Sequence, residues 1–387
     1  MRPKVKESYS KLDKKTAQRI IIILVDEDVS YDKRVLRSLS TFTNFKVIDC
    51  KYLRQRRKKI PLTDYFEAFN ISINALISGF KSWKHLMQFY GLTFDSFHKN
   101  FLNSWNSILC SRSLKELHLQ RNSIGFIHAH DLYCGLIGAK LKKIFGVKLI
   151  YDAHEVVFHR NRKNSFLRSL FDFSLEKHVI QAADEIRVVN TKIAELYCLV
   201  YPGIDSRLRV VSNDHFVPHP VDIESISNSE HATIVYVGQG VKGRQLEQLA
   251  LITKDSELSV HAFFIGEVPT FAVNAQWIIG PRDYENNLVA LVQSQRCMMW
   301  CCVENICLSY QLALPNKFFQ ALAVGMPVIV SKDTYLSEIV HKYKIGIVLD
   351  DHDSNWILNQ IKSKEFVEWV GNILRLRNDL SKGLVVL

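Results

Sequence analysis

The sequence predicts an α/β protein with two doubly wound domains in tandem. Three observations lead to this class. The chain has 387 residues, which is too long for one ordinary hydrophobic core. Short apolar runs rich in Ile and Val alternate with helical patterns, as expected for strands that are buried on both faces and joined by crossover helices. This alternation stops at a polar stretch rich in Pro, Ser and Asn, residues 218–231, and then restarts.

The first half of the chain, residues 19–217, is expected to form one of these domains. Its candidate strands lie at residues 20–25, 45–52, 126–129, 148–152, 185–189 and 208–212. Between several of them the spacing predicts helices at residues 33–41, 132–145, 166–183 and 192–199. Residues 62–119 show no convincing strand, and their aromatic residues recur at helical spacing, which predicts a helical insert.

The second half, residues 232–365, is expected to form the other domain, with residues 218–231 as the linker. Its candidate strands lie at residues 233–237, 258–265, 276–279, 297–303, 327–331 and 346–349, and its candidate helices at 243–251, 283–293 and 316–324. A helical stretch, 354–380, follows the last strand. Residues 366–387 are therefore expected to form a C-terminal helix that could pack back on the first domain.

The net charge of +11 is concentrated at one end of the chain. Residues 1–60 hold 17 Lys/Arg and 7 Asp/Glu, a net of +10, and the remainder is nearly neutral. A basic patch favours phosphate, on nucleic acid or on anionic lipid. For residues 1–18, a solvated basic tail that binds no phosphate is an equally good interpretation. The basic run 54–59 precedes the aromatic insert, so that residues 51–119 either pack on their domain or dock on an anionic membrane surface.

Composition excludes several classes. With 47% hydrophobic and 23% charged residues the chain is that of a packed globular protein, not a disordered one. The longest apolar runs are far shorter than the ~20 residues of a membrane-spanning helix, and no secretory signal precedes residue 20. We therefore expect a cytoplasmic protein. The clustered cysteines, 297, 301, 302 and 307, read as buried thiols and not as disulfides or metal ligands.

Phosphate-binding groups follow the first strand of the second half. The turn Gly238-Gln239-Gly240-Val241-Lys242-Gly243-Arg244 leads into a helix. Glycines allow a ligand to approach the backbone closely, and a helix N-terminus with two cations favours an anion. The turn is expected to hold a diphosphate, although an ordinary strand–helix turn can carry the same glycines.

A later helix, residues 316–324, carries complementary groups. Asn316 and Lys317 lie at the positive end of its dipole, where a phosphate binds favourably. Gln320 lies one turn further along, and its amide suits the hydroxyls of a ribose. Tyr284, which follows another strand, is expected to line a pocket for the base.

Acidic and histidine side chains gather after strands of the first half. Because the carboxyl ends of parallel strands share one edge of the sheet, we expect these side chains to form a site. They lack the H-E-x-x-H spacing of a metal site, and no metal is expected. The candidates are Asp28, Asp32 and Arg34 after one strand, His130 and Asp131 after another, and His154 and Glu155 after a third.

Several segments that contain these residues resemble glycosyltransferase family 4. YVGQGVKGR and PNKFFQALAVGMPVIVS are similar to its nucleotide-sugar-binding domain. LVDEDVSYDKRVLRSL, HAHDLYCGLIGAKL and KLIYDAHE are similar to its acceptor domain. The resemblance covers most of the chain in the expected order, and it leaves out residues 1–18 and 62–119.

The resemblance implies the GT-B architecture, two Rossmann-like domains facing across a cleft. Such enzymes take a sugar from a nucleotide-sugar substrate, usually with retention of configuration and with neither a bound metal nor another cofactor. By this analogy His154 is the catalytic-site histidine that contacts the donor sugar. Lys242 and Arg244, with the helix that starts at Asn316, neutralise the leaving diphosphate, which is the main electrostatic task. Asp28, Asp32, Arg34, His130, Asp131 and Glu155 form the acceptor side.

The sequence departs from the family at two positions. Members commonly carry two glutamates with seven residues between them, and here the corresponding residues are Leu312 and Gln320. The leading hypothesis is a glycosyltransferase at the inner face of a bacterial membrane that extends a lipid-linked cell-surface glycan (capsule, O-antigen or lipopolysaccharide). The missing acidic pair keeps open a degenerate binding or scaffold subunit, and an epimerase of similar shape is a third reading. Nucleic-acid binding is the least favoured hypothesis, because the sequence contains no recognisable nucleic-acid-binding motif.

Overall fold

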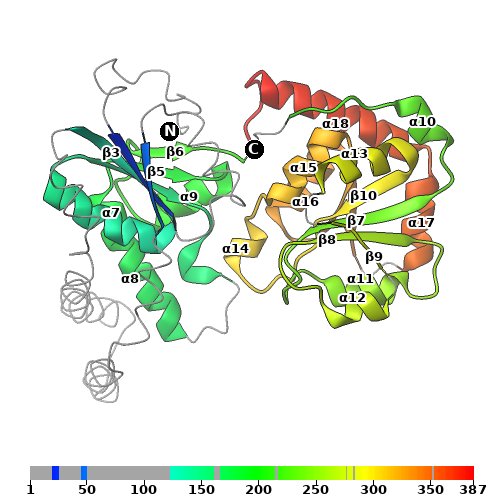
Figure 1. Cartoon of the computed structure of the whole chain (residues 1–387), viewed down its shortest axis with the longest axis horizontal. Helices are drawn as coiled ribbons and strands as arrows, with labels where there is room; N and C mark the ends of the chain where they lie inside the picture. Colours follow the sequence, from blue (N-terminus) through cyan, green and yellow to red (C-terminus); the bar gives the residue numbers. More distant parts are fainter. Residues whose placement is uncertain are drawn as a thin grey trace.

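The predicted pair of doubly wound domains is present in the computed structural model (Figure 1). It describes residues 20–25, 45–49, 123–160, 166–213, 217–275, 277–281, 284–350 and 353–387. These residues form two six-stranded sheets, and every strand pairing in both is parallel. The carboxyl ends of the strands therefore form one edge of each sheet, where polar side chains can gather.

The first sheet has the strand order β2-β1-β3-β4-β5-β6. Its strands are β1 (Ile20–Val25), β2 (Phe45–Asp49), β3 (Ile124–His130), β4 (Lys148–Ala153), β5 (Glu185–Val188) and β6 (Leu208–Val210). Its described helices are α7 (Asp131–Phe145), the short 3-10 helix η5 (Val157–His159), α8 (Phe166–Ala182) and α9 (Thr191–Val200). Each β-α-β unit from β3 onward moves in the same direction across the sheet, so right-handed crossovers place α7, α8 and α9 on one face.

The two faces of the first sheet bury different side chains. The face toward α7 and α8 holds the main apolar core of this domain, which includes Ile127, Ala129 and Tyr151. Phe126 and Ile150 belong to a smaller apolar cluster on the other face. Because side chains alternate along a strand, His128 and His130 of β3 and Asp152 of β4 point to this second face. Buried polar residues thus lie on the same face as the smaller cluster, toward its carboxyl edge.

The second sheet has the strand order β12-β11-β10-β7-β8-β9. Its strands are β7 (Ala232–Gly238), β8 (Ser259–Phe264), β9 (Ile278–Ile279), β10 (Arg296–Trp300), β11 (Val328–Ser331) and β12 (Gly346–Leu349). In Figure 1, α11 (Leu246–Thr253) and α12 (Thr270–Asn274) lie on one side of it, and α13 (Glu285–Ser294), α15 (Asn316–Val324) and α16 (Tyr335–Tyr343) lie on the other. This strand order is that of a dinucleotide-binding sheet, in which the order reverses between β7 and β10.

Several elements differ from the sequence expectations. The stretch predicted as a linker contains a short helix, α10 (Ile223–Asn228), capped by the Asp222 carboxylate, which accepts from the backbone N–H groups of Glu224 and Ser225. Helices α14 (Leu308–Gln311) and α16 were not expected either. The helical stretch after β12 divides into α17 (Ser354–Lys362) and α18 (Glu365–Ser381).

The C-terminal helix packs mainly within the second domain. Its buried side chains, among them Phe366, Ile373 and Leu376, belong to the core around the second sheet. Beyond the helix, Val386 packs against the core of the first domain. The return to the first domain that the sequence suggested is therefore made by the tail that follows α18.

Some expectations fall on residues outside the described ones. They are the basic tail 1–18, the helix at 33–41, the basic run 54–59 and the insert 62–119. Among the residues that are described, no helix is both long enough and apolar enough to pass through a membrane. The four clustered cysteines are buried free thiols, as predicted, although of the four only Cys297 lies within a strand.

Candidate active site

The glycine turn after β7 lies where the strand order of the second sheet reverses. At such a point two neighbouring crossovers leave the sheet in opposite directions and open a crevice for a ligand. Gly238 has a φ of +143°, which a residue with a side chain rarely adopts. A Cβ on Gly240 would lie 2.3 Å from the Pro269 Cγ. The turn is fixed further by the Tyr236 hydroxyl, which donates to the Gln239 carbonyl at 2.6 Å.

Lys317 lies beside this turn, at the second residue of α15. The sequence predicted it as a phosphate ligand at the start of the helix, and its side chain is only 6% exposed. Its Nζ lies 4.5 Å from the centre of the Tyr236 ring and has no hydrogen-bond partner among the described residues. Burial, with a contribution from the positive charge of Arg244, lowers the pKa of Lys317 to about 8, although the nearby thiols oppose the shift. A buried amine with unused donors, at a helix N-terminus, is suited to binding an anion.

Arg244 completes the cationic part of the site. Its guanidinium lies over the Tyr310 ring at 4.7 Å from the centre, and its backbone carbonyl accepts from the Trp300 indole N–H at 3.2 Å. Two like charges held close together favour an anion between or beside them. The structure thus brings together two of the three predicted cations. Lys242 and Asn316 are exposed.

Tyr284 and Gln320, predicted separately, touch each other. The Gln320 amide donates a hydrogen bond to the Tyr284 hydroxyl. Tyr284 precedes α13 and its ring packs against Phe263, and burial raises the pKa of its hydroxyl to about 12. The Gln320 Oε1 is buried without a hydrogen-bond partner among the described residues. The pair therefore offers a neutral acceptor that a hydroxyl group of a ligand can use.

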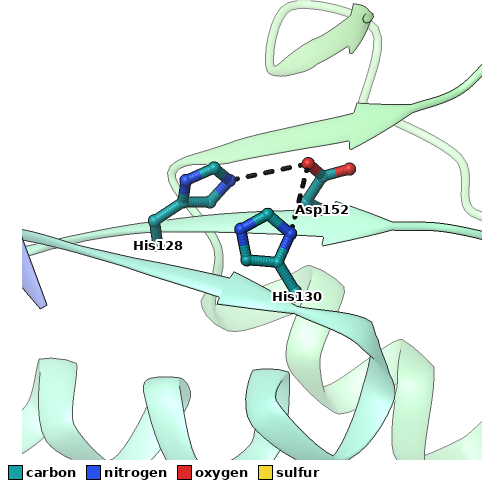
Figure 2. A group of neighbouring side chains, drawn as sticks. All are labelled: His128, His130 and Asp152. Carbon is teal, nitrogen blue, oxygen red and sulfur yellow. Dashed lines mark ion pairs between the residues drawn. The ribbon is translucent and has the colours of Figure 1, made fainter. Parts of the chain in front are cut away.

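A second cluster lies at the carboxyl edge of the first sheet (Figure 2). His130 and Asp152 are paired in register on β3 and β4, and the His130 Nδ1 lies 3.6 Å from the Asp152 Oδ2. The His128 Nε2 lies 3.6 Å from the same oxygen. Burial is the main reason that the pKa of His128 is lowered, so this imidazole is neutral at pH 7. These three side chains are almost completely buried.

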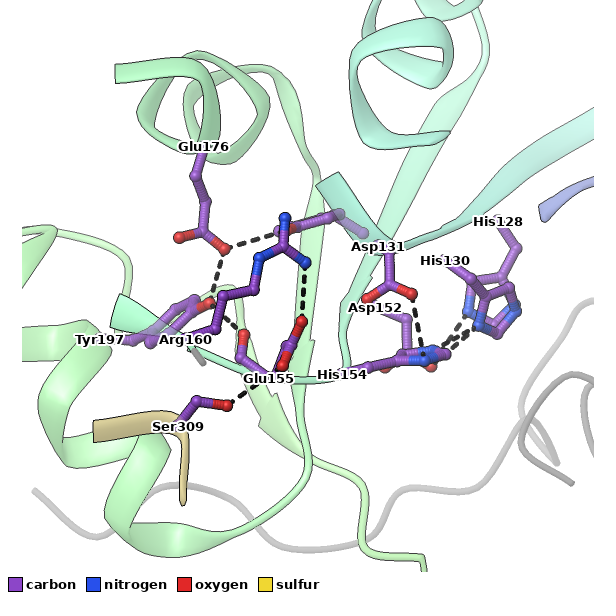
Figure 3. A network of polar contacts seen from close by, with 11 residues as sticks. His128, His130, Asp131, Asp152, His154, Glu155, Arg160, Glu176, Tyr197 and Ser309 are labelled. Atoms are coloured by element: carbon purple, nitrogen blue, oxygen red, sulfur yellow. Dashed lines mark hydrogen bonds and ion pairs between the residues drawn. The ribbon is translucent and has the colours of Figure 1, made fainter. Parts of the chain in front are cut away.

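His154 extends this cluster toward solvent (Figure 3). Its Nε2 lies 3.0 Å from the His130 Nδ1, and its Nδ1 lies 3.4 Å from the Asp131 Oδ2. The side chains of His154 and Asp131 are 17% and 37% exposed, so a ligand can reach them. Asp131 has a φ of +66°, a strained value for a residue with a side chain. The structure therefore brings together three predicted residues, His130, Asp131 and His154, with Asp152 behind them.

His128, His130 and Asp152 also form a group that could hold a metal ion. One ligand atom from each lies within 4.8 Å of the others. Tetrahedral zinc ligands at about 2.1 Å from the metal lie roughly 3.4 Å apart. The group fits such a site only approximately, and each imidazole faces the Asp152 carboxylate at 3.6 Å, which is longer than a hydrogen bond.

Glu155 does not lie with His154 in this cluster. Its carboxylate pairs with the Arg160 guanidinium at 2.7 Å and accepts from the Ser309 hydroxyl of α14 at 3.2 Å. The adjacent contact is similar: the His159 Nδ1 accepts from the Leu308 backbone N–H at 2.8 Å. The structure therefore places this predicted acceptor residue at the contact between the two domains.

The two halves of the site are joined through α14, which lies between the sheets in Figure 1. Ser309 contacts Glu155, next to His154, and Tyr310 lies under the Arg244 guanidinium. Cys307, just before α14, experiences the charges of both Glu155 and Arg244. The histidine cluster (His128, His130, Asp152 and His154) and the cationic turn (residues 238–244) are thus connected through the same interdomain contact.

Sequence reasoning missed a buried carboxyl group close to this junction. Glu176 of α8 accepts hydrogen bonds from the hydroxyls of Tyr151, Tyr197 and Tyr201 at 2.6–2.9 Å. Burial raises its pKa to about 7, although these hydrogen bonds oppose the shift. Tyr197 and Tyr201 are one helical turn apart and could have been paired from the sequence, but their shared partner could not. The remaining predicted residues, Asp28, Asp32 and Arg34, lie outside the described part of the chain.

Comparisons with known proteins agree with this architecture. Residues 291–386 match the family model of the glucosyltransferase 3-like C-terminal domain. Sucrose-phosphate synthase from Thermosynechococcus elongatus is similar in structure, with a TM-score of 0.50 and 14% identity over 95% of this chain and 99% of that one. HepE from Anabaena, solved with UDP-glucose, has a TM-score of 0.53 and 12% identity over 93% of this chain and 95% of that one. No curated protein sequence matches the chain.

These similarities confirm the predicted GT-B fold and the predicted enzyme class. The matched C-terminal segment contains β10, α15 and Lys317, which belong to the cationic half of the site. The chain has the GT-B fold, and its residues 291–386 are similar to the C-terminal domain of glucosyltransferase 3-like proteins.

Proposed function

We propose that the protein transfers a sugar from a nucleotide-sugar to a glycan acceptor, with the second domain holding the donor. The observation that carries this proposal is the buried Lys317 ammonium beside Arg244 at the N-terminus of α15. Burying an amine is unfavourable unless an anion compensates it. A diphosphate supplies two negative groups at this position, and its departure as a leaving group is assisted by the same cations.

The acceptor side is proposed to lie at the histidine cluster of the first domain. His154 is the residue proposed to contact the donor sugar near the reaction centre, and Asp131 is accessible beside it. Asp28, Asp32, Arg34 and Glu155 are proposed to shape the acceptor side from the sequence alone. Lys242 and Asn316 remain proposed donor ligands on the same ground.

The finer assignment rests on the sequence. The proposal is a family 4 enzyme that works with retention of configuration and without a metal, at the inner face of a bacterial membrane. Its acceptor would be a lipid-linked cell-surface glycan, and residues 51–119 would dock on anionic lipid. Co-sedimentation with anionic vesicles that weakens with salt, without comparable binding to duplex DNA, would support the membrane part.

A catalytically degenerate subunit is the second candidate, and Leu312 favours it. The side chain at this position, where family members carry a glutamate, packs against the core of the first domain, and its carbonyl accepts from the Asn190 amide at 2.7 Å. The residue therefore holds the two domains together and does not present an acid to a ligand.

Release of free nucleotide from a panel of sugar nucleotides, with glycan and lipid-linked acceptors, tests the proposal. UDP-glucose is the first donor to try, since HepE was solved with it. We expect turnover with at least one pair, unchanged by a chelator, and its loss in Lys317→Met but not in the exposed control Lys342→Met. Binding without turnover across a broad panel would favour the degenerate subunit, and conversion of the donor without an acceptor would identify an epimerase.

A further inference from the structure

The two ring nitrogens of His154 face different partners, and those partners fix its tautomer. The Asp131 carboxylate, 3.4 Å from Nδ1, can only accept a hydrogen bond when ionised. The proton of a neutral His154 ring is therefore on Nδ1. Its Nε2 is then an acceptor, and the nitrogen 3.0 Å away, His130 Nδ1, must be the donor.

The donor in this contact is itself held in place. The His130 ring is 2% exposed and lies against the His128 ring, with 4.3 Å between their centres. The Asp152 carboxylate, 3.6 Å from the same His130 Nδ1, favours the tautomer that carries a proton there. Because β3 and β4 pair His130 with Asp152 in register, the sheet itself sets this geometry.

From these contacts we infer that His130 is a positioning residue for the sugar-contacting histidine. It donates its Nδ1–H to the His154 Nε2, and with Asp131 on the other side it fixes the ring's tautomer and orientation. The inference rests on the proposed function for the role of His154 in the reaction, but the hydrogen bond itself does not. With both nitrogens occupied inside the protein, the neutral ring offers the substrate no free basic nitrogen, so it shapes and orients the site and does not accept the proton of the acceptor hydroxyl.

The strain at Asp131 supports this reading. A φ of +66° is unfavourable for a residue with a side chain. This conformation holds the carboxylate at the start of α7, opposite the His154 ring. Strained backbone is retained where the side chain has a positional task.

The test uses nitrogen NMR of labelled imidazoles together with kinetics. In the intact chain, His154 should show a protonated Nδ1 and an unprotonated Nε2. In His130→Ala the tautomers should mix, kcat should fall about tenfold or more, and the KM for the donor should change less than about twofold. His130→Asn, whose amide nitrogen occupies the place of Nδ1, should restore the His154 signals and most of kcat.

His261→Asn, on β8 in the other domain, should change neither the His154 signals nor kcat. If His130→Ala folds and leaves the His154 tautomer unchanged, or raises kcat, the inference is wrong. Stoichiometric zinc that is lost in His130→Asn would also overturn it, because the same nitrogen would then be a ligand. If no turnover is found, the proposed function is wrong. The NMR spectra still test whether His130 donates a hydrogen bond to His154.

Discussion

Lys317 is buried and has no hydrogen-bond partner in the described part of the chain, so its effect on binding should depend on pH. Its pKa is lowered to about 8, so the amine is charged at pH 7 and mostly neutral at pH 9. A diphosphate binds the charged form, and each pH unit above the pKa weakens binding about tenfold. UDP affinity measured by calorimetry should therefore fall roughly tenfold between pH 7 and pH 9.

Lys317→Met separates this effect from the titration of other groups. The variant should bind UDP weakly at both pH values, with little change between them. Lys342→Met, which removes an exposed charge on α16, should keep the full pH dependence. Equal pH dependence in Lys317→Met and the intact chain would show that another group is responsible.

Gly240 is the residue whose lack of a side chain matters most for the turn after β7. In Gly240→Ala the new methyl group would overlap the Pro269 ring, so the turn must move. We expect the affinity for UDP to fall about tenfold, as for a misplaced binding group. Gly371→Ala is the matched control, because no atom lies within 4 Å of its Cβ. Equal affinity in both variants, measured by calorimetry, would show that the turn does not form the site.

At the scale of elements, α8 carries a buried titrating group that should make stability depend on pH. The pKa of Glu176 is raised from 4.5 to about 7, so the folded chain holds a proton that the unfolded chain has lost in this window. Stability is therefore expected to fall as the pH rises from about 4.5 to 7. A shift of this size corresponds to roughly 3 kcal/mol.

Glu176→Gln removes the titration and keeps an acceptor for the tyrosine hydroxyls. Denaturant unfolding at pH 5 and pH 8 should show that the variant gains about 3 kcal/mol relative to the intact chain as the pH rises. Parallel stability curves for the two proteins would contradict a raised pKa at this residue.

The strands were predictable from sequence because strands buried on both faces are continuous apolar runs. The first strand agrees with its prediction at both ends, and α15 likewise, since Pro315 and Gly325 mark its limits. The missed α10 lies in a polar stretch, and its signal is a single capping aspartate. The Thr334 capping box of α16 is visible in the sequence, but it was not used to predict a helix there. Short helices of this kind depend on caps more than on periodicity.

The residues of the candidate site could be selected from the sequence, but their burial and their contacts between domains could not. Residues after parallel strands meet at one edge, which brought His130 near His154 and Arg244 near Lys317. The burial of Lys317 could not be read from a helix start. Nor could the Glu155–Ser309 contact, which joins residues 154 positions apart through the packing of two domains.

At the scale of the whole molecule, a short set of contacts joins the domains. Besides α14, the N-terminal end of α9 meets the second domain: Thr191 contacts the Tyr335 hydroxyl at 3.1 Å, and Lys192 pairs with Glu338 at 3.8 Å. Polar contacts of this kind are typical of interdomain interfaces, which permit relative motion.

A crystal structure with UDP-glucose tests the central claim most directly. We expect the diphosphate oxygens within about 3 Å of the Lys317 Nζ and the Arg244 guanidinium, the ribose near Gln320 and Tyr284, and the glucose directed toward His154. A nucleotide bound elsewhere, with Lys317 still buried and free of phosphate, would contradict it.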